Sequence, residues 1–210
     1  MFRRDFLRGG IVAGALTVAG CSMPAAEPSF REGFEDGIGD WEAGAAIGPE
    51  VDIEEFEWEL GVSEEQAAAG SRSLRIWNEG DYDDGVTWGV HPVSVESGRA
   101  YQVTVSAQIW SESESFNTLR DAVMRLGPEP PAVEEDFPHP GVNTTELGET
   151  AYGGLREPLW LTDGWREYTF EWTTPELSTE TLYVAVGTSV IWEGDATHYV
   201  DEVTVDFAER

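Results

Sequence analysis

Four side chains in two short stretches have the chemistry needed to hold a sugar ring. Arg75 and Trp77 lie two residues apart in one stretch, and Gln108 and Trp110 lie two residues apart in another. Flat aromatic faces pack on the apolar side of a sugar, while neighbouring amide and charged groups hydrogen-bond its hydroxyls. An exposed tryptophan is costly unless something covers it, so these four residues form a candidate ligand-binding site.

Residues 127–164 offer an alternative explanation, because this long interval could itself cover both tryptophans. It holds six of the eleven prolines and shows no regular apolar period. Loops of this length in compact domains are usually functional or disordered. Within it, Asn143-Thr144-Thr145 matches an N-glycosylation acceptor, so Asn143 is a predicted glycosylation site.

The sequence contains no recognisable catalytic arrangement. Its three histidines, His91, His139 and His198, are widely spaced, and the motifs of serine hydrolases, zinc proteases and P-loop enzymes are absent. A glycosidase needs only two carboxylates, which an acidic chain always supplies, so motifs alone leave that alternative open. We expect a binding protein; a structural or adhesive protein of the cell envelope, without a small ligand, is the second alternative.

The charge of the chain limits its partners. Asp and Glu total 41 against 12 basic residues, all of them Arg, which gives a net charge of −29. Such a chain repels nucleic acid and anionic lipid surfaces. The acidic residues are spread along the whole sequence, and at about 1 M salt the screening length falls to about 3 Å, which suppresses their repulsion. This composition resembles that of haloarchaeal proteins.

The first residues look like an export signal. Arg3 and Arg4 precede an apolar run over 9–20, which is too short to cross about 30 Å of hydrocarbon as a helix. The arginine pair indicates a twin-arginine signal over 1–20. Cys21, the only cysteine, follows directly and is the expected lipidation site, with 21–29 as a tether. We therefore expect an exported protein on the outer face of the cytoplasmic membrane, which it contacts only through this lipid.

Alternation of apolar and polar residues predicts strands from residue 30 onward. In the clearest stretch, 101–110, five apolar residues from Tyr101 to Ile109 share one face, and Gln108 and Trp110 lie on the other. Similar stretches occur near residues 73–77, 86–91, 122–126, 168–172, 182–186 and 199–207. Seven or eight strands separated by Gly, Asp and Pro predict an all-β domain over 30–210, a two-sheet antiparallel β-sandwich.

Three segments resemble the galactose-binding-like jelly rolls, especially the carbohydrate-binding modules of families 4, 9 and 22. They are Phe34-Glu35-Asp36-Gly37 followed by Gly39-Asp40-Trp41, then Ala69-Gly70-Ser71-Arg72-Ser73-Leu74-Arg75-Ile76, and last Tyr199-Val200-Asp201-Glu202-Val203-Thr204-Val205. The likeness spans about 30–207, although the long interval at 127–164 departs from the family pattern. It implies a jelly-roll fold and a ligand that is a glycan or a cell-surface polymer.

The same resemblance implies a structural calcium ion where the first and last strands meet, with Glu35 and Asp201 as its carboxylate ligands. Alternation along 199–207 would place Asp201 on the apolar face with Val203 and Val205. A buried carboxylate must be paired or bound to a metal. The alternative to calcium is an ion pair with Arg31 or Arg72.

Overall fold

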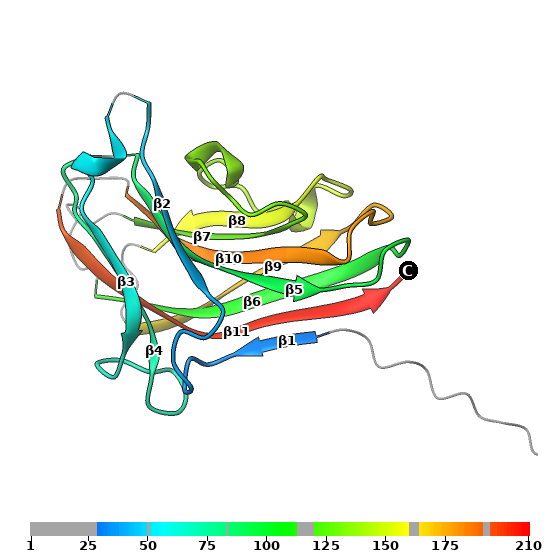
Figure 1. Ribbon diagram of the computed structural model, residues 1–210, viewed down its shortest axis with the longest axis horizontal. Helices are drawn as coiled ribbons and strands as arrows, with labels where there is room; N and C mark the ends of the chain where they lie inside the picture. Colours follow the sequence, from blue (N-terminus) through cyan, green and yellow to red (C-terminus); the bar gives the residue numbers. More distant parts are fainter. Residues whose placement is uncertain (1–28, 50, 83, 113–119, 160–163, 191–193) are drawn as a thin grey trace, which may run out of the picture.

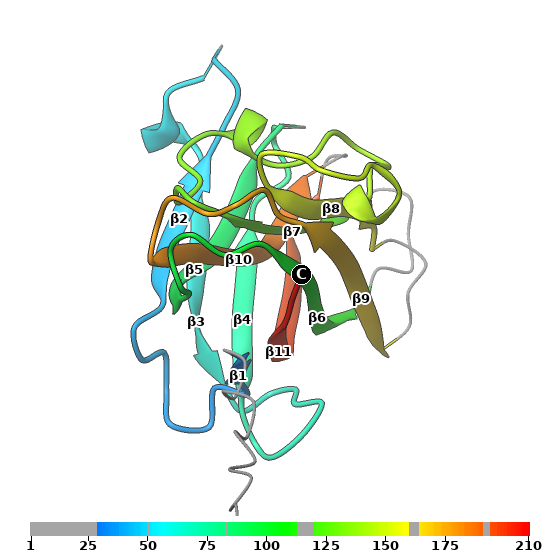
Figure 2. The same ribbon diagram turned by 90° about the vertical axis from the view of Figure 1, so that its right-hand side faces the viewer.

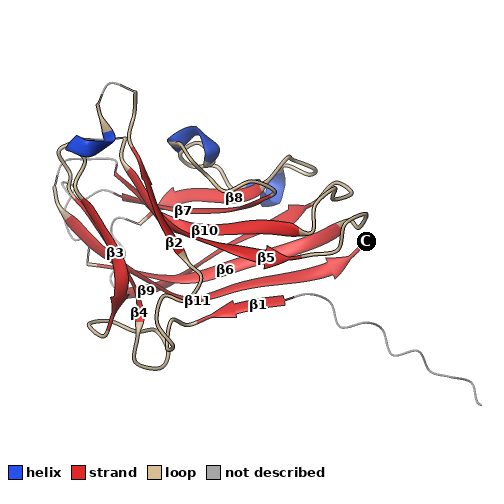
Figure 3. Ribbon diagram, viewed as in Figure 1, coloured by secondary structure: helices blue, strands red, loops and turns tan. Residues whose placement is uncertain are grey.

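The computed structural model describes residues 29–49, 51–82, 84–112, 120–159, 164–190 and 194–210. Two antiparallel sheets lie face to face, which confirms the predicted all-β sandwich (Figures 1 and 3). Within the described ranges the helical pieces are short 3-10 turns: η1 (Ile53–Glu55), η3 (Glu134–Asp136) and η4 (Thr144–Glu146). No helix in these ranges is long and apolar enough to span a bilayer.

The first sheet contains six strands. Its order is β3-β4-β11-β6-β9, and β1 also pairs with β11. The strands are β1 (Ser29–Glu32), β3 (Trp58–Ser63), β4 (Ser73–Asn78), β6 (Tyr101–Ser111), β9 (Gly164–Thr173) and β11 (Ala196–Glu209). Buried and half-buried residues alternate along the whole of β6, because one face of this sheet packs on the core and the other does not.

The second sheet contains five strands in the order β2-β5-β10-β7-β8. They are β2 (Glu42–Ala46), β5 (Val86–Ser94), β7 (Arg120–Gly127), β8 (Gly153–Pro158) and β10 (Thr181–Val190). Every residue of β7 is buried, so both faces of the sheet are covered at this strand. The inner face packs against the six-stranded sheet around a core that includes Trp41 and Trp172, as predicted.

The interval 127–164 differs from the predicted patternless loop, because it contains β8. This strand pairs with β7 from Leu126↔Gly153 to Asp121↔Pro158. It shows no alternation because Gly153 through Arg156 are buried on both faces. Between β7 and β8 the chain folds back over the outer face of the five-stranded sheet (Figure 2).

This covering segment, residues 128–141, forms a second apolar cluster with the sheet below it. The ring of Phe137 meets the ring of Trp88 edge to face, with centroids 5.2 Å apart. Trp88 is therefore buried, as predicted, although it belongs to this cluster and not to the core between the sheets. The protein itself thus covers the outer face of the five-stranded sheet over Trp88, while a hollow of about 620 Å³ stays open nearby, with Val90, Pro92 and Tyr183 among its lining residues.

Candidate ligand-binding site

The four predicted ligand-binding residues lie on the outer face of the six-stranded sheet. Trp110 on β6 is the cross-strand partner of Trp165 on β9 and of Tyr199 on β11. Tyr199 is in turn the partner of Arg75 on β4. Directly opposed residues of neighbouring strands share a face, so Trp165, Trp110, Tyr199 and Arg75 form one row across four strands.

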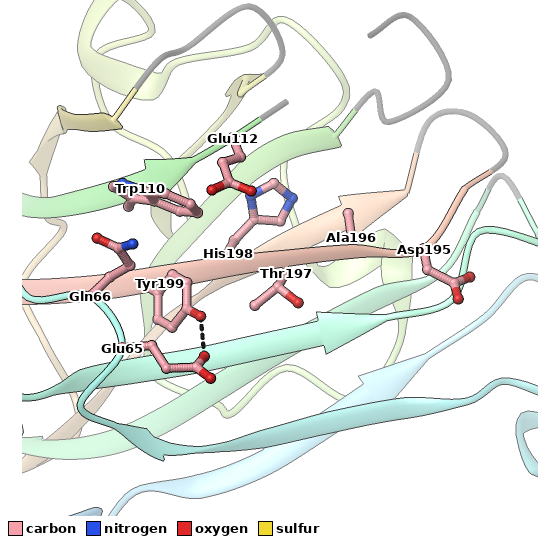
Figure 4. Close-up of a pocket in the computed structure, with 9 residues that line it drawn as sticks. All are labelled: Glu65, Gln66, Trp110, Glu112, Asp195, Ala196, Thr197, His198 and Tyr199. Carbon is pink, nitrogen blue, oxygen red and sulfur yellow. Dashed lines mark hydrogen bonds between the residues drawn. The ribbon is translucent and has the colours of Figure 1, made fainter. Parts of the chain in front are cut away.

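A cavity of about 450 Å³ opens beside Trp110 (Figure 4). The rings of Trp110 and Tyr199 meet at 76° with centroids 5.3 Å apart, so Tyr199 supports the indole from its edge. Tyr199 is only 5 % exposed, which leaves Trp110 as the main stacking surface. The cavity is lined by Glu65, Gln66, Trp110, Glu112, Asp195, Ala196, Thr197, His198 and Tyr199.

A second hollow of about 500 Å³ lies on the same face, on the other side of the Trp110–Trp165 pair. Trp165, Gln108 and Glu167 contribute to its lining. Beside them the hydroxyls of Ser106 and Thr204 are 2.7 Å apart and hydrogen-bonded across β6 and β11. Gln108, predicted as a hydroxyl-binding residue, therefore lies in this second hollow and not beside Trp110 in the first.

Arg75 does not line the first cavity but contacts Glu65, one of the carboxylates that does. Its Nη1 donates to Oε2 of Glu59 at 2.8 Å, and its Nε lies 4.0 Å from Oε2 of Glu65. The guanidinium thus helps to orient Glu65, which also accepts a hydrogen bond from the hydroxyl of Tyr199. Trp77 is half-buried and opposes Thr197, so it adjoins the cavity without lining it.

Two groups in the lining have shifted pKa values that keep them neutral. Burial, together with the hydrogen bond to Glu65, raises the pKa of Tyr199 to about 12. Burial, and secondarily the nearby positive charge of Arg120, lowers the pKa of His198 to about 3. At neutral pH both side chains are therefore uncharged.

A β-bulge in β11 explains why the sequence did not place Tyr199 on this face. Asp201 opposes Gln108 and Thr204 opposes Ser106, so Glu202 and Val203 together oppose the single residue between them on β6. Glu202 has a left-handed φ of 49°. The extra residue reverses the alternation, and Tyr199 and Asp201 do not share the face of Val203; the predicted placement of Asp201 is wrong.

The alternative in which residues 127–164 cover the tryptophans is also wrong for the described part of that interval. The lining of both cavities comes from other segments, among the residues that the structure describes. The interval instead covers the other sheet, where Arg156 pairs with Asp121 at 3.4 Å and with Glu134 at 2.8 Å.

Asp201 is fully buried, and among the described residues its carboxylate is held by backbone N–H groups and not by an arginine. Its Oδ2 accepts hydrogen bonds from the backbone N–H groups of Ala68 and Ala69 at 2.8 and 3.1 Å, and its Oδ1 accepts from Glu202. The expected arginine partners are engaged elsewhere, Arg31 with Asp206 and Arg72 with Glu64. Backbone donors satisfy this carboxylate, so the ion-pair alternative is wrong.

Glu35 is held in a similar way. Its Oε1 accepts from the backbone N–H groups of Ser71 and Arg72, which lower its pKa. A calcium ion takes six to eight oxygens, but the carboxylate oxygens of Glu35 and Asp201 already accept hydrogen bonds from backbone N–H groups and, at Oε2 of Glu35, from the hydroxyl of Ser71. No group of three or more acidic, His or Cys side chains in the described ranges could hold a metal. The arrangement does not form a calcium shell, and calcium binding stays a prediction.

Asn143 is a structural residue of the described fold. Its Nδ2 donates to Oε1 of Glu157 at 2.8 Å and to the carbonyl of Thr169 at 3.1 Å. Its Oδ1 accepts from the N–H of Thr145 and thereby caps η4. A glycan on Nδ2 would replace one of these hydrogens, and glycosylation stays a prediction. Cys21, Arg3 and Arg4 lie outside the described residues, so lipidation and export stay predictions too.

Comparisons with known proteins bear on the fold. No protein-family model matches the sequence, and no curated protein matches it. A solved structure from a study of the promiscuous specificity of β-sandwich carbohydrate-binding modules shares 20 % identity and a TM-score of 0.51. The match covers 85 % of this chain and 61 % of that one, so this chain spans less than two thirds of that structure's length.

Two further matches cover nearly the whole of the other chain. The CBM22-1 xylan-binding domain of Paenibacillus barcinonensis Xyn10C matches with 14 % identity and a TM-score of 0.49, over 89 % of this chain and 99 % of that one. TmCBM61, solved in complex with β-1,4-galactotriose, matches with 12 % identity and a TM-score of 0.49, over 84 % and 95 %. The match with a TM-score of 0.51 has only 20 % identity, so it speaks for architecture alone. The chain has the β-sandwich fold found in carbohydrate-binding modules.

Proposed function

We propose that this chain is a non-catalytic module that binds a glycan, or a glycan-like polymer of the cell surface, on the outer face of its six-stranded sheet. The observation that carries the proposal is the aromatic row of Trp165, Trp110 and Tyr199 between two hollows. Aromatic platforms flanked by amide, hydroxyl and carboxylate groups suit the alternating apolar and polar surfaces of a sugar chain.

The partial cover over the other sheet supports the choice of face. Phe137 packs on Trp88, and a buried carboxylate–guanidinium cluster fixes the segment above β7. A ligand could reach the part of that face over Trp88 only by displacing the segment, at the expense of the apolar contacts and ion pairs that hold it. The outer face of the six-stranded sheet requires no such displacement along β6 and β9, because the outward residues of these two strands are half-buried or exposed.

The size of the two hollows also fits. At about 450 and 500 Å³ they lie in the usual range of small-ligand sites, roughly 300–1,000 Å³. Since Trp110 and Trp165 are cross-strand partners, a sugar chain could follow the row and occupy both hollows.

The cellular setting is part of the same proposal and rests on the sequence alone. The Arg3–Arg4 pair would direct export, and lipid on Cys21 would anchor the module outside the cytoplasmic membrane. A net charge of −29 favours neutral or cationic partners over nucleic acid.

Substitution of Trp110 tests the site directly. Isothermal titration with a panel of soluble oligosaccharides should show binding by the wild type and a loss of about tenfold or more for Trp110→Ala, as for other central aromatic anchors. Trp58→Ala is the matched control, because this half-buried tryptophan lines neither hollow. Unchanged binding by Trp110→Ala would remove the proposed site.

A further inference from the structure

The first cavity is strongly acidic, which restricts what can bind there. Glu65, Glu112 and Asp195 line it, and its described lining contains no arginine. Figure 4 shows Glu112 beside His198 at one end and Glu65 below Tyr199 at the other. In this view the indole of Trp110 lies next to Glu112, and the ring of Tyr199 lies between Trp110 and Glu65.

The surrounding arginines only partly compensate this charge. Arg75 contacts Glu59 more closely than Glu65, at 2.8 Å against 4.0 Å. Arg120 is the positive group near Asp195, but it lies in the interior and is fully buried. The three lining carboxylates and the neighbouring Glu59 thus share two guanidinium groups, those of Arg75 and Arg120. Among the residues that the structure describes, Glu112 makes no side-chain hydrogen bond or ion pair.

The uncharged part of the lining also suits a cation. A cation placed over an indole face is attracted by the ring quadrupole, and tryptophan provides the strongest such site. Tyr199 and His198 stay neutral, so neither repels positive charge. His198 is only 1 % exposed, and its strand partners Ile76 and Ser111 are fully buried, so its ring faces the interior and Trp110 remains the aromatic surface open to a ligand.

We infer that the glycan bound beside Trp110 carries a free ammonium group, so that its preferred unit is an amino sugar without an N-acetyl group. This inference rests on the proposed glycan-binding function and names the ligand class of the same site. The sugar ring would stack on Trp110, and its ammonium would lie between Glu112 and Glu65. Uronic acids and sulfated sugars would meet uncompensated carboxylates and be rejected.

Three trisaccharides that differ only at C2 test the inference. They are the β-1,4-linked trimers of glucosamine, N-acetylglucosamine and glucose, titrated calorimetrically at mildly acidic pH so that the amine is protonated. We expect glucosamine trimer to bind on the order of tenfold more tightly than either neutral trimer. Its affinity alone should fall as potassium chloride is raised, since only its binding depends on charge.

Two variants with matched chemistry separate the site from the general acidity of the chain. Glu112→Gln keeps the shape of the cavity and should remove most of the preference for glucosamine. Glu176→Gln removes the same charge from an exposed loop that lines neither hollow, between β9 and β10, and should leave the preference unchanged.

The outcomes distinguish this inference from the function on which it rests. Equal affinity for the three trimers, or loss of the preference in Glu176→Gln as well, would overturn the amino-sugar assignment while glycan binding stands. Tighter binding of an oligouronate would also overturn it. If neither these trimers nor the wider oligosaccharide panel bound, the proposed function would fail together with the inference.

Discussion

Asp121 connects a buried ion pair to a measurable dependence of stability on pH. This carboxylate is 2 % exposed beneath the segment 128–141, with Oδ2 3.4 Å from Nε of Arg156. Burial raises its pKa from 3.8 to about 6, and the opposing effect of Arg156 is smaller. The folded protein therefore takes up a proton on Asp121 at a pH where the unfolded chain does not.

The sign of the effect follows from that difference. Because the folded-state pKa lies above the unfolded one, this group's contribution to the free energy of unfolding rises as pH falls from about 6 to 3.8, and then levels off. A shift of about two pKa units corresponds to roughly 3 kcal/mol at most. Other carboxylates titrate in the same range, so the effect must be isolated by comparison with a variant.

Urea unfolding of wild type and Asp121→Asn provides that comparison. The free energy of unfolding of the wild type minus that of the variant should rise by roughly 2–3 kcal/mol between about pH 7 and about pH 4. The exposed carboxylate of Asp36, changed to Asn, is the control and should give no rise of this kind. A difference that stays flat, or falls toward acid, would show that Arg156 keeps Asp121 ionised and would refute the burial argument.

Three further predictions concern the two sheet faces and the carboxylates of Glu35 and Asp201. Phe137→Ala should lower the free energy of unfolding by about 3–5 kcal/mol, because it removes the ring that packs on Trp88. The control Val133→Ala, at an exposed position, should change it by less than about 0.5 kcal/mol, and equally small losses in both variants would contradict a packed covering segment. Tyr199→Phe keeps the ring and removes the hydroxyl that holds Glu65, so it should cost about 1 kcal/mol in urea unfolding with the glycan site retained; abolished binding would show that the hydroxyl itself contacts the ligand. A chelator should leave the melting temperature unchanged in calorimetry, because N–H donors already satisfy Glu35 and Asp201; a drop of several degrees would establish the calcium ion that the family resemblance implies.

The alternation of residue types predicted those strands that have one open face. β6 is the clearest case, since its half-buried residues from Gln102 to Trp110 differ in polarity from the buried ones between them. The same reasoning failed for β8, whose residues Gly153 to Arg156 are buried on both sides and show no period. A covered sheet face removes the pattern that would reveal its strand.

The candidate site was predicted in part for a related reason. Trp110 and Gln108 were placed correctly because β6 is regular from end to end. Tyr199 was assigned to the wrong face because the bulge before Thr204 reverses the alternation, and no residue type in this stretch indicates an inserted position. The partners of Asp201 were missed because backbone N–H groups of a distant loop carry no signature in the sequence.

The most direct test of glycan binding on the six-stranded sheet is a nuclear magnetic resonance titration that follows the indole N–H signals during addition of an oligosaccharide. The account predicts shifts for Trp110 and Trp165, which flank the two hollows, and none for Trp88 beneath Phe137 or for Trp172 in the core. Shifts confined to Trp88, with Trp110 and Trp165 unmoved, would place the ligand on the five-stranded sheet and contradict the account.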